Sequence, residues 1–209
     1  MKSIFITGTG TNIGKTLVAA IVTESLQADY WKPVQAGYED GTDSKLVRSL
    51  ISNKKSIIHP EAYVLEMPAS PHLAAPAEGK RLTVSDIVQR KPGTSSPLII
   101  EGAGGLMVPL NEQEFITDLI RELNSDVIIV SKNELGSINH SLLTAAVLKK
   151  EKIKVLGWIF TGEYKSYEDE IASWSGFPKI GSIKQLDVID RAAIKNQAKI
   201  LQPNLKKFL

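Results

Sequence analysis

Short apolar runs alternate with segments of helical periodicity along most of the chain. Apolar runs with no polar face predict strands, and apolar residues at helical spacing predict helices. The predicted strands cover residues 3–7, 30–34, 97–102, 126–131, 154–160 and 177–183, and the predicted helices cover 15–27, 115–123, 137–151 and 187–209, the last of them basic and moderately amphipathic. Strands that are apolar on both faces and alternate with helices are typical of a parallel sheet covered on both sides. We therefore expect a doubly wound, mostly parallel α/β fold, a three-layer sandwich in one domain over residues 1–209.

Residues 35–96 interrupt this alternation. The segment is rich in Pro, Gly, Ser and charged residues, and it holds one helix pattern, at residues 43–51. Residues 67–79, "MPASPHLAAPAEG", carry too many turn-forming residues for a linker. Long connections after strands of such sheets usually carry function, so we expect this segment to contribute to a site.

Composition and charge narrow the choice of partners. The 209 residues have a net charge of +2 and no basic block, which argues against nucleic acid or an anionic membrane as a partner. The absence of cysteine excludes disulfides, thiolate metal sites and a cysteine nucleophile, and is compatible with a reducing cytosol. No signal-peptide core precedes the first strand, and no run approaches the roughly 18 apolar residues of a membrane span. We expect a cytoplasmic protein.

A glycine-rich loop follows the first predicted strand. Gly14, Lys15 and Thr16 match the end of the phosphate-binding pattern G-x-x-x-x-G-K-[ST], but Thr9 occupies the place of its first glycine, and glycines stand at Gly8 and Gly10 instead. In such a loop, backbone N–H groups and a helix N-terminus bind phosphate, the lysine reaches the outer phosphates, and the hydroxyl binds Mg²⁺. Strand, loop, Gly-Lys-Thr and helix occur here in the required order. They predict a nucleotide site of a variant subclass, with an ordinary strand-to-helix turn as the alternative.

Three charged residues lie at or after predicted strand ends. Glu101 ends an apolar strand, so its carboxylate is expected at the carboxyl edge of the sheet, where it would organise Mg²⁺; a solvated or helix-capping carboxylate is the alternative. Lys32 ends the second strand and would stabilise charge developing in phosphoryl transfer, unless it only extends along a strand edge. For Asp43, at the start of a predicted helix, the residues alone leave helix capping and metal binding open.

A further strand-to-helix junction lies at residues 133–144, "NELGSINHSLLT". Gly136 and Ser137 precede the predicted helix, so its first backbone N–H groups are free to bind an anion such as a carboxylate. A simply capped helix explains the same residues equally well.

Five motifs together carry a resemblance to a known family. "TGTGTNIGKT", "KPVQAG", "SPHLAA", "EGAGGLMVPL" and "GSINHSLLT" occur in this order and spacing, and over about residues 3–160 the chain resembles the dethiobiotin synthetases. That family's glycine loop is shifted in the same way. The resemblance implies a homodimer with its active site at the subunit interface. It also implies a cyclo-ligase of biotin biosynthesis that forms C–N bonds, converting diaminopelargonic acid, CO₂ or bicarbonate, and ATP or another nucleoside triphosphate, with Mg²⁺, into dethiobiotin through a carbamic-phosphoric anhydride.

The resemblance also implies roles for individual residues. Lys15, Lys32 and Thr11 would be catalytic, and Thr16, Asp43 and Glu101 would surround Mg²⁺. The nucleotide would contact Gly10, Thr11, Asn12, Ile13, Gly14, Lys15, Thr16, Leu17 and Glu101, and the substrate would contact Lys32, Ala36, Gly104, Gly136, Ser137, Ile138 and Asn139, the last four from across the dimer interface.

The chain departs from the family pattern at several positions. Gly10 stands where the family usually has Asp, and Ala36 stands where a small hydroxyl residue is common. After the strand at 154–160, Thr161 and Gly162 replace the usual Asn-Asp-like pair that recognises adenine, and residues 181–186, "GSIKQL", lack the usual proline. We therefore hypothesise weakened selectivity for adenine.

Two other classes of P-loop protein are the alternatives. Partition and septum-positioning ATPases share the expected sheet, but they carry an additional lysine early in the loop, where this chain has Gly10. Amidotransferase-type synthetases of the cobalamin pathway use similar phosphate chemistry, but their glutaminase domain needs a catalytic cysteine, which this chain lacks. A binding module alone would not explain Lys15, Thr16, Lys32 and Glu101 together.

Overall fold

A six-stranded parallel sheet forms the centre of the molecule. The computed structural model describes residues 3–39, 41–163 and 167–208. The strand order is β2-β5-β1-β6-β7-β8, and every pairing in this sheet is parallel. The strands are β1 (Ser3–Gly8), β2 (Asp29–Trp31), β5 (Leu98–Glu101), β6 (Asp126–Lys132), β7 (Val155–Thr161) and β8 (Lys179–Ile183). The predicted doubly wound α/β class is confirmed.

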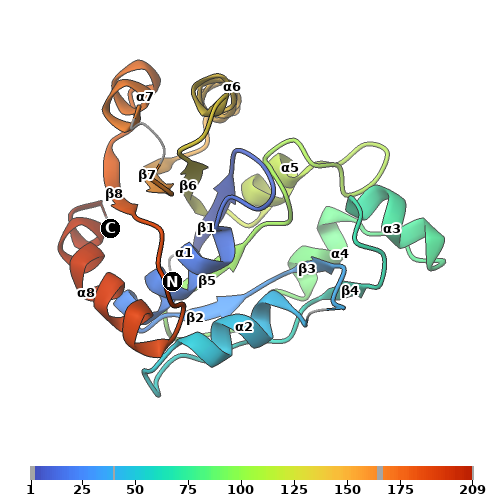
Figure 1. The fold of residues 1–209 in the computed structure, drawn as a ribbon. Coiled ribbons are helices and arrows are strands. Elements are labelled where there is room, and N and C mark those ends of the chain that lie inside the picture. The colour runs from blue at the N-terminus through green and yellow to red at the C-terminus, as the bar shows by residue number, and fades with distance from the viewer. Residues whose placement is uncertain (1–2, 40, 164–166, 209) are drawn as a thin grey trace.

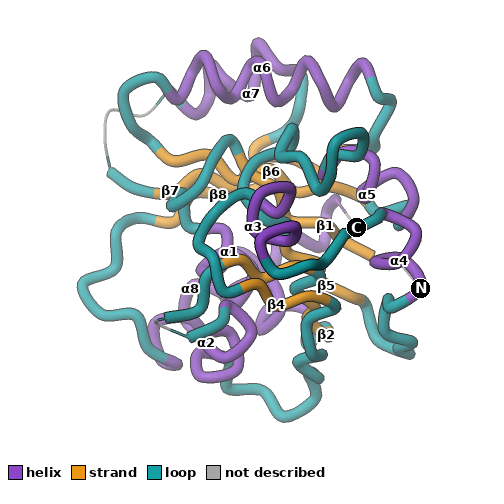
Figure 2. Tube along the Cα trace, turned by 90° about the vertical axis from the view of Figure 1, so that its right-hand side faces the viewer, coloured by secondary structure: helices purple, strands orange, loops and turns teal. Residues whose placement is uncertain are grey.

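Helices cover both faces of this sheet, which makes three layers (Figures 1 and 2). On one face lie α1 (Lys15–Leu26), α2 (Asp43–Leu50) and α8 (Arg191–Phe208), and on the other lie α4 (Val84–Gln89), α5 (Ile116–Glu122), α6 (Ser137–Lys150) and α7 (Glu168–Ser175). Alternate strand residues feed the two cores. Ile4 and Ile6 of β1 pack under α1, whereas Phe5 between them packs on the opposite face. Because both faces are covered, the strands read as continuous apolar runs.

The predicted strand at residues 30–34 is wrong in extent. The chain leaves the main sheet after Trp31, and residues Val34–Ala36 form β3, which pairs in parallel with β4 (Tyr63–Leu65) in a separate two-stranded sheet. Pro33 stands at the break, since a residue without an N–H cannot continue the ladder of a buried strand. Its carbonyl instead accepts hydrogen bonds from the N–H groups of Ala62 and Tyr63, both at 3.0 Å. The break turns β3 away from the sheet and opens space above Lys32.

In the described part of the chain, three helices lie where the sequence pattern predicted none: α7, and two short helices within residues 67–89. Within residues 67–79, α3 (Pro71–Ala77) begins at a proline, which suits the first turn of a helix because that N–H has no intrahelical partner. It packs on the small β3–β4 sheet. The six-residue α4 follows Thr83, whose side chain accepts a hydrogen bond from the N–H of Asp86 at 3.1 Å. Within residues 35–96, β3, β4 and α3 therefore form a small folded lobe, whereas α2 and α4 pack on the two faces of the main sheet.

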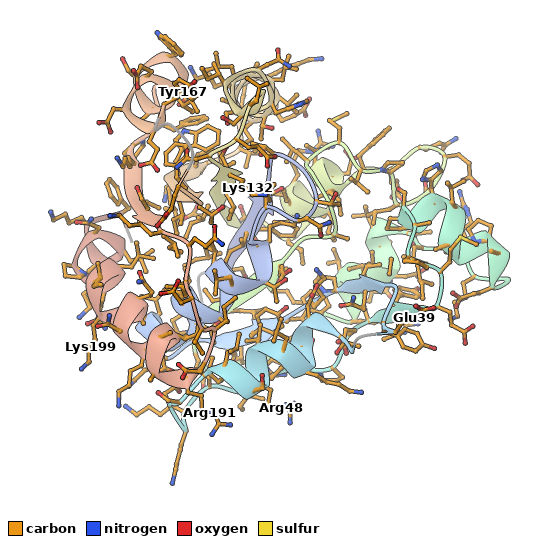
Figure 3. All side chains as sticks on the ribbon, in the orientation of Figure 1. Glu39, Arg48, Lys132, Tyr167, Arg191 and Lys199 are labelled. Atoms are coloured by element: carbon orange, nitrogen blue, oxygen red, sulfur yellow. The ribbon has the colours of Figure 1, made fainter. Side chains whose placement is uncertain are left out.

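The C-terminal helix packs along the first helix. α8 begins at Arg191, four residues after the predicted start, and it lies against α1 on the outer side of the sheet. The Gln202 amide donates to Ser25 O of α1 at 2.7 Å, and Arg191 Nε donates to Ser49 O of α2 at 2.8 Å, beside Arg48 (Figure 3). The first contact holds α8 to α1, the helix that follows the glycine loop, and the second holds α8 to α2. No helix among the described residues is long and apolar enough to cross a membrane.

Candidate active site

A cavity of about 870 Å³ opens at the carboxyl edge of the sheet, between the glycine loop and the β3–α3 lobe. Its position follows from the strand order, because the chain turns in opposite directions on either side of β1 and leaves a crevice there. Its walls come from four parts of the chain: the glycine loop, the β2–β3 junction with Asp43, the 68–71 turn, and the end of β5. The lining residues are Thr11, Asn12, Gly14, Lys15, Thr16, Lys32, Val34, Gln35, Ala36, Asp43, Pro68, Ala69, Ser70, Pro71, Glu101, Ala103, Gly104 and Val108.

The shifted first glycine of the loop has a packing reason. A Cβ added at Gly8 would come within 2.2 Å of Ile13 Cδ1, so the buried Ile13 side chain occupies the space that a larger residue would need. At the other end of the loop, Gly14 caps α1 with φ of 88°, in the left-handed region that favours glycine. Lys15 Nζ lies across the loop and donates to Gly10 O at 2.5 Å. The loop thus closes around its own lysine.

Four side chains from distant parts of the chain meet in the cavity. Lys32 Nζ lies 2.6 Å from Asp43 Oδ2 and 3.0 Å from Glu101 Oε1, and it also donates to Gly102 O at 3.3 Å. Thr16 Oγ1 donates to the same Glu101 Oε1 at 2.9 Å. Lys32 and Glu101 are buried, whereas Asp43 is partly exposed. The buried lysine is therefore neutralised by two carboxylates, which is the condition for placing a cation there.

Strand register brings this cluster together. Glu101 is paired with Ile6 of β1, two residues before the loop, and Trp31 of β2 is paired with Ile100, so Lys32 follows beside Glu101. Asp43 reaches the cluster because α2 begins there: Thr42 caps the helix by accepting a hydrogen bond from the N–H of Lys45 at 3.3 Å. The capping role that the sequence left open for Asp43 therefore belongs to Thr42, and the Asp43 side chain pairs with Lys32 instead.

The electrostatics of the two lysines differ. Burial, and then the positive charge of Lys32, lower the pKa of Lys15 to about 8, against smaller opposing effects of Glu101 and Asp43. Burial alone would also lower the pKa of Lys32, but its two carboxylate partners outweigh that effect and raise the pKa. Lys32 thus carries a firmly held charge, whereas Lys15 forms no ion pair with a carboxylate of the described residues, so an anion in the loop would stabilise its charge best.

The oxygen atoms of the cluster suit a magnesium ion. The hydroxyl of Thr16 and the carboxylates of Glu101 and Asp43 are hard donors, and Mg²⁺ is commonly held by one or two carboxylates together with substrate phosphates and water. Among the described residues, no group of three or more His, Cys, Asp or Glu could hold a metal ion. A magnesium ion here would consequently depend on phosphate oxygens supplied by a nucleotide.

Several of the sequence-predicted residues lie outside this cavity. Ile13 and Leu17 do not line the cavity, since Ile13 is buried beneath the loop and Leu17 packs against the apolar core. Gly136, Ser137, Ile138 and Asn139 lie at the N-terminus of α6. A second hollow of about 410 Å³ lies beside that helix, lined by Gly8, Thr9, Gly10, Thr11, Gly105, Leu106, Met107, Val108, His140, Leu143, Thr144 and Val147. Within one chain, the four α6 residues do not meet Lys32 and Glu101 in one cavity.

Two residues that no sequence motif singled out hold the cluster in place. Gln35 bridges the β2–β3 junction to α2: its amide donates to Gly37 O at 2.7 Å, and its Oε1 accepts from Asp43 N at 3.0 Å. Tyr30 OH donates to Glu101 Oε2 at 2.8 Å. Burial, followed by the nearby Glu101 charge, raises the pKa of Tyr30 well above its ordinary value, so the hydroxyl remains a donor. The available signal for Tyr30 was its position two residues before Lys32, on the same face of a strand.

The position expected to contact the nucleotide base has a different role here. Thr161 Oγ1 donates to Ile13 O at 2.8 Å, and its methyl carbon lies 3.2 Å from where a Cβ of Gly14 would be. Gly162 O accepts a hydrogen bond from the Asn133 amide at 3.4 Å. Both residues are thus engaged in holding the loop and the strand ends. Gly10, by contrast, faces open space: a Cβ there would meet nothing within 4 Å.

Sequence comparisons identify similar proteins over nearly the whole chain. A family model described as an AAA domain matches residues 2–193. A protein of Christiangramia forsetii named ATP-dependent dethiobiotin synthetase BioD is 45% identical over 205 residues, which covers 98% of each chain. One of the same name from Cytophaga hutchinsonii is 51% identical over 171 residues, 82% of each chain.

Solved structures with the same fold are much less similar in sequence. The MinC:MinD cell division complex of Aquifex aeolicus matches with a TM-score of 0.62 at 12% identity, covering 99% of this chain and 95% of that one. A ParA family ATPase from Chlorobium tepidum matches with a TM-score of 0.56 at 15% identity, covering 99% and 93%. At these identities the likeness concerns the fold alone, so it lends the partition-ATPase alternative no support beyond the shared sheet.

Proposed function

The chain belongs to the family of ATP-dependent dethiobiotin synthetases, and we propose that it closes the ureido ring of dethiobiotin in the cavity beside the glycine loop. One observation carries the proposal. Lys15, Thr16, Lys32, Asp43 and Glu101, which come from four separate segments, meet around a single cavity large enough for phosphates and a small substrate. Binding alone would not require a second, buried lysine beside the phosphate loop.

The proposed reaction uses diaminopelargonic acid, CO₂ and a nucleoside triphosphate. One amine adds to CO₂ and loses a proton to give a carbamate, whose oxygen attacks the γ-phosphorus and expels the nucleoside diphosphate. The second amine then attacks the carbonyl carbon of the resulting mixed anhydride, and phosphate leaves as the ring closes. No covalent bond to the protein is needed, so catalysis rests on positioning and on charge.

The residues of the cavity divide this work. Lys15 would bind the β- and γ-phosphate oxygens. Because burial lowers the pKa of Lys15, its charged form needs a nearby anion, and the phosphates would supply it. Lys32 would stabilise negative charge on the carbamate and the γ-phosphate, and Thr11 would donate to substrate or phosphate from the loop. Mg²⁺ held by Thr16, Asp43 and Glu101 would neutralise phosphate charge. Ala36 and Gly104 would form the floor against the substrate chain.

We propose further that a second copy of the chain completes the site. At the α6 N-terminus the Ser137 N–H donates to Glu134 O at 3.1 Å, but the buried Ser137 hydroxyl has no hydrogen-bond partner among the described residues. That hydroxyl and the positive end of the helix dipole suit the substrate carboxylate. Beside this helix, Met107 and Leu143 are exposed on the rim of the second hollow. An apolar rim next to the loop favours a homodimer in which α6 of the partner faces the cavity. The small net charge of +2 leads us to propose no nucleic acid or membrane partner.

Two further expectations remain part of the proposal. Because Thr161 and Gly162 are engaged in the fold, we expect weak selection of the base and comparable kcat/KM values for ATP, GTP and CTP. A large preference for ATP would contradict this. The length of 209 residues suits a single catalytic domain, and the absence of cysteine is compatible with the reducing cytoplasm in which we propose that it acts.

The test is direct turnover. Purified protein is mixed with diaminopelargonic acid, bicarbonate, Mg²⁺ and, in separate reactions, ATP, GTP or CTP, and dethiobiotin is detected by mass. We expect product only with all components, and its loss in Lys15→Ala. Lys45→Ala is the matched control, because Lys45 is exposed on α2 and lines neither hollow. If the nucleotide is hydrolysed slowly but no dethiobiotin forms with any of the three, the synthetase proposal fails and the switch-ATPase alternative gains.

A further inference from the structure

We propose that Tyr30 is a positioning residue for the reaction: its hydroxyl fixes one oxygen of Glu101 so that the other faces the phosphate and metal side of the cavity. This inference rests on the proposed function and deepens it. Tyr30 touches neither hollow and would contact no substrate, so its effect would pass entirely through Glu101.

The hydrogen bonds of Glu101 separate its two oxygens. Oε2 accepts from Tyr30 OH at 2.8 Å, whereas Oε1 accepts from Thr16 Oγ1 at 2.9 Å and from Lys32 Nζ at 3.0 Å. The carboxylate is only 1% exposed, so water cannot replace a lost partner freely. The last side-chain torsion of a glutamate normally takes a broad range of angles. Donors on both carboxylate oxygens restrict this torsion of Glu101 and fix which oxygen faces the cavity.

The fold fixes Tyr30 more firmly than most residues of an edge strand. β2 is the edge strand of the main sheet, but its outer side is covered. Tyr30 N donates to Ile57 O, and Tyr30 O accepts from His59 N, both at 2.9 Å. The ring itself is fully buried in the apolar core under α1 and α2. The hydroxyl therefore projects from a rigid base toward Glu101.

Strand alternation supplies a matched control next to Tyr30. Trp31 is equally buried, and its Nε1 donates a hydrogen bond to Pro60 O at 3.1 Å, but it points to the opposite face of the sheet and packs in the other core. Trp31→Phe thus removes one hydrogen bond from a buried ring, as Tyr30→Phe does. Only the Tyr30 substitution leaves the buried carboxylate with one donor fewer.

The experiment measures binding of a non-hydrolysable ATP analogue by calorimetry, with and without Mg²⁺. The ratio of the two dissociation constants gives the gain in affinity that Mg²⁺ provides. In Tyr30→Phe we expect this gain to fall by about 10-fold, the lower end of what the loss of a residue behind a metal ligand usually costs, with metal-free binding unchanged. We also expect kcat to fall while KM for diaminopelargonic acid holds. In Trp31→Phe the midpoint of urea unfolding should drop, but the gain should match wild type.

Each outcome bears on one proposal. A Tyr30→Phe protein that is folded by circular dichroism and keeps the wild-type gain would overturn the role of Tyr30 and leave the proposed function standing. Equal losses of the gain in both variants would show a general packing effect and would also overturn it. If wild type shows no Mg²⁺-dependent gain at all, the magnesium site within the proposed function fails, and the role of Tyr30 fails with it.

Discussion

Polar side chains gather at two places along the carboxyl edge of the same sheet, and they are used in opposite ways. On the β2–β5–β1 side, Lys32, Glu101 and Asp43 pair around an open cavity. On the β6–β7–β8 side, the Asn133 amide donates to Glu168 Oε1 at 2.6 Å, and Glu168 Oε2 also accepts from Ser182. The first cluster, which we call the open cluster, borders space for a ligand, whereas the second, the closed cluster, binds α7 to the strand ends.

The contrast shows that hydrogen-bonded polar residues at a strand end do not by themselves identify a site. The two clusters resemble each other in pairing a lysine with a buried carboxylate, since Lys179 Nζ lies 2.9 Å from Glu168 Oε2. They differ in whether a ligand has room to replace one of the internal partners. In the open cluster, phosphate and Mg²⁺ can take over contacts that the side chains now make to one another. Substitutions should therefore be partly compensated by ligand in the open cluster only.

The largest effect is expected for Lys32→Met. This change keeps the length of the side chain but leaves the buried Glu101 carboxylate without its cation, which typically costs about 3–5 kcal/mol of unfolding free energy. Mg²⁺ with nucleotide should restore a substantial part of that loss, because it returns positive charge to the same place, while turnover should remain lost. Urea unfolding with and without Mg²⁺ and nucleotide measures both. Lys45→Met, on an exposed position of α2, should change little, and an equal response of the two variants to ligand would contradict the prediction.

A smaller effect is expected for Thr161→Val, between the two clusters. Removing the hydroxyl leaves Ile13 O buried without a donor, at about 1–3 kcal/mol. Ser49→Ala, which removes an exposed hydroxyl-to-carbonyl hydrogen bond of 2.7 Å, is the control and should cost less. The ratio of kcat/KM for ATP over CTP should not change, because Thr161 serves the loop. A shift in that ratio would mean that Thr161 contacts the base after all.

The smallest effect is expected in the closed cluster, for Glu168→Gln. Burial would raise the pKa of Glu168, but hydrogen bonds from Ser182, Lys179 and Asn133 outweigh it and hold the pKa below its ordinary value of 4.5. A depressed folded-state pKa contributes stability that is present above the unfolded pKa and is lost as pH falls through the folded value. The free energy of unfolding of wild type should therefore exceed that of the variant by a constant amount, about 1 kcal/mol, above pH 5. Under more acidic conditions the difference should shrink.

Urea unfolding across pH 3 to 7 measures this difference. Asp169→Asn is the control, since Asp169 pairs with the same Lys179 at 3.0 Å but its side chain is 87% exposed, and it should show almost no pH-dependent difference from wild type. Mg²⁺ with nucleotide should not restore the stability of either variant. Rescue of Glu168→Gln by Mg²⁺ and nucleotide would remove the distinction between the open and closed clusters.

The sheet was predictable because burial on both faces leaves a plain signal. β1, β5, β6, β7 and β8 all lie within one or two residues of the predicted runs. Residues 35–96, apart from the helix at 43–50, were not predictable in the same way. β3 and β4 have three residues each, too few to show an alternation of apolar and polar residues. α3 and α4 are short helices that depend on packing against neighbours.

The open cluster could be foreseen in part, for a physical reason. Lys15, Thr16 and Glu101 are placed by features local to the sequence: a loop pattern and the end of a strand. The partnership of Lys32 with Asp43 depends on the turn at Pro33 and on the cap at Thr42, which the sequence pattern did not resolve. Gln35 acts through contacts between loops that no spacing in the sequence marks, and the only mark of Tyr30 was its position two residues before Lys32.

The position of β1 between β5 and β6 has a consequence for how the protein is made. β1 is synthesised well before its partners β5 and β6, which end at Glu101 and Lys132. At roughly 5–20 residues per second, this buried strand waits about 5–20 seconds for its first neighbour. α8, which packs on α1, is synthesised later still. The phosphate loop is therefore translated well before the elements that support it, and it gains that support only late in synthesis.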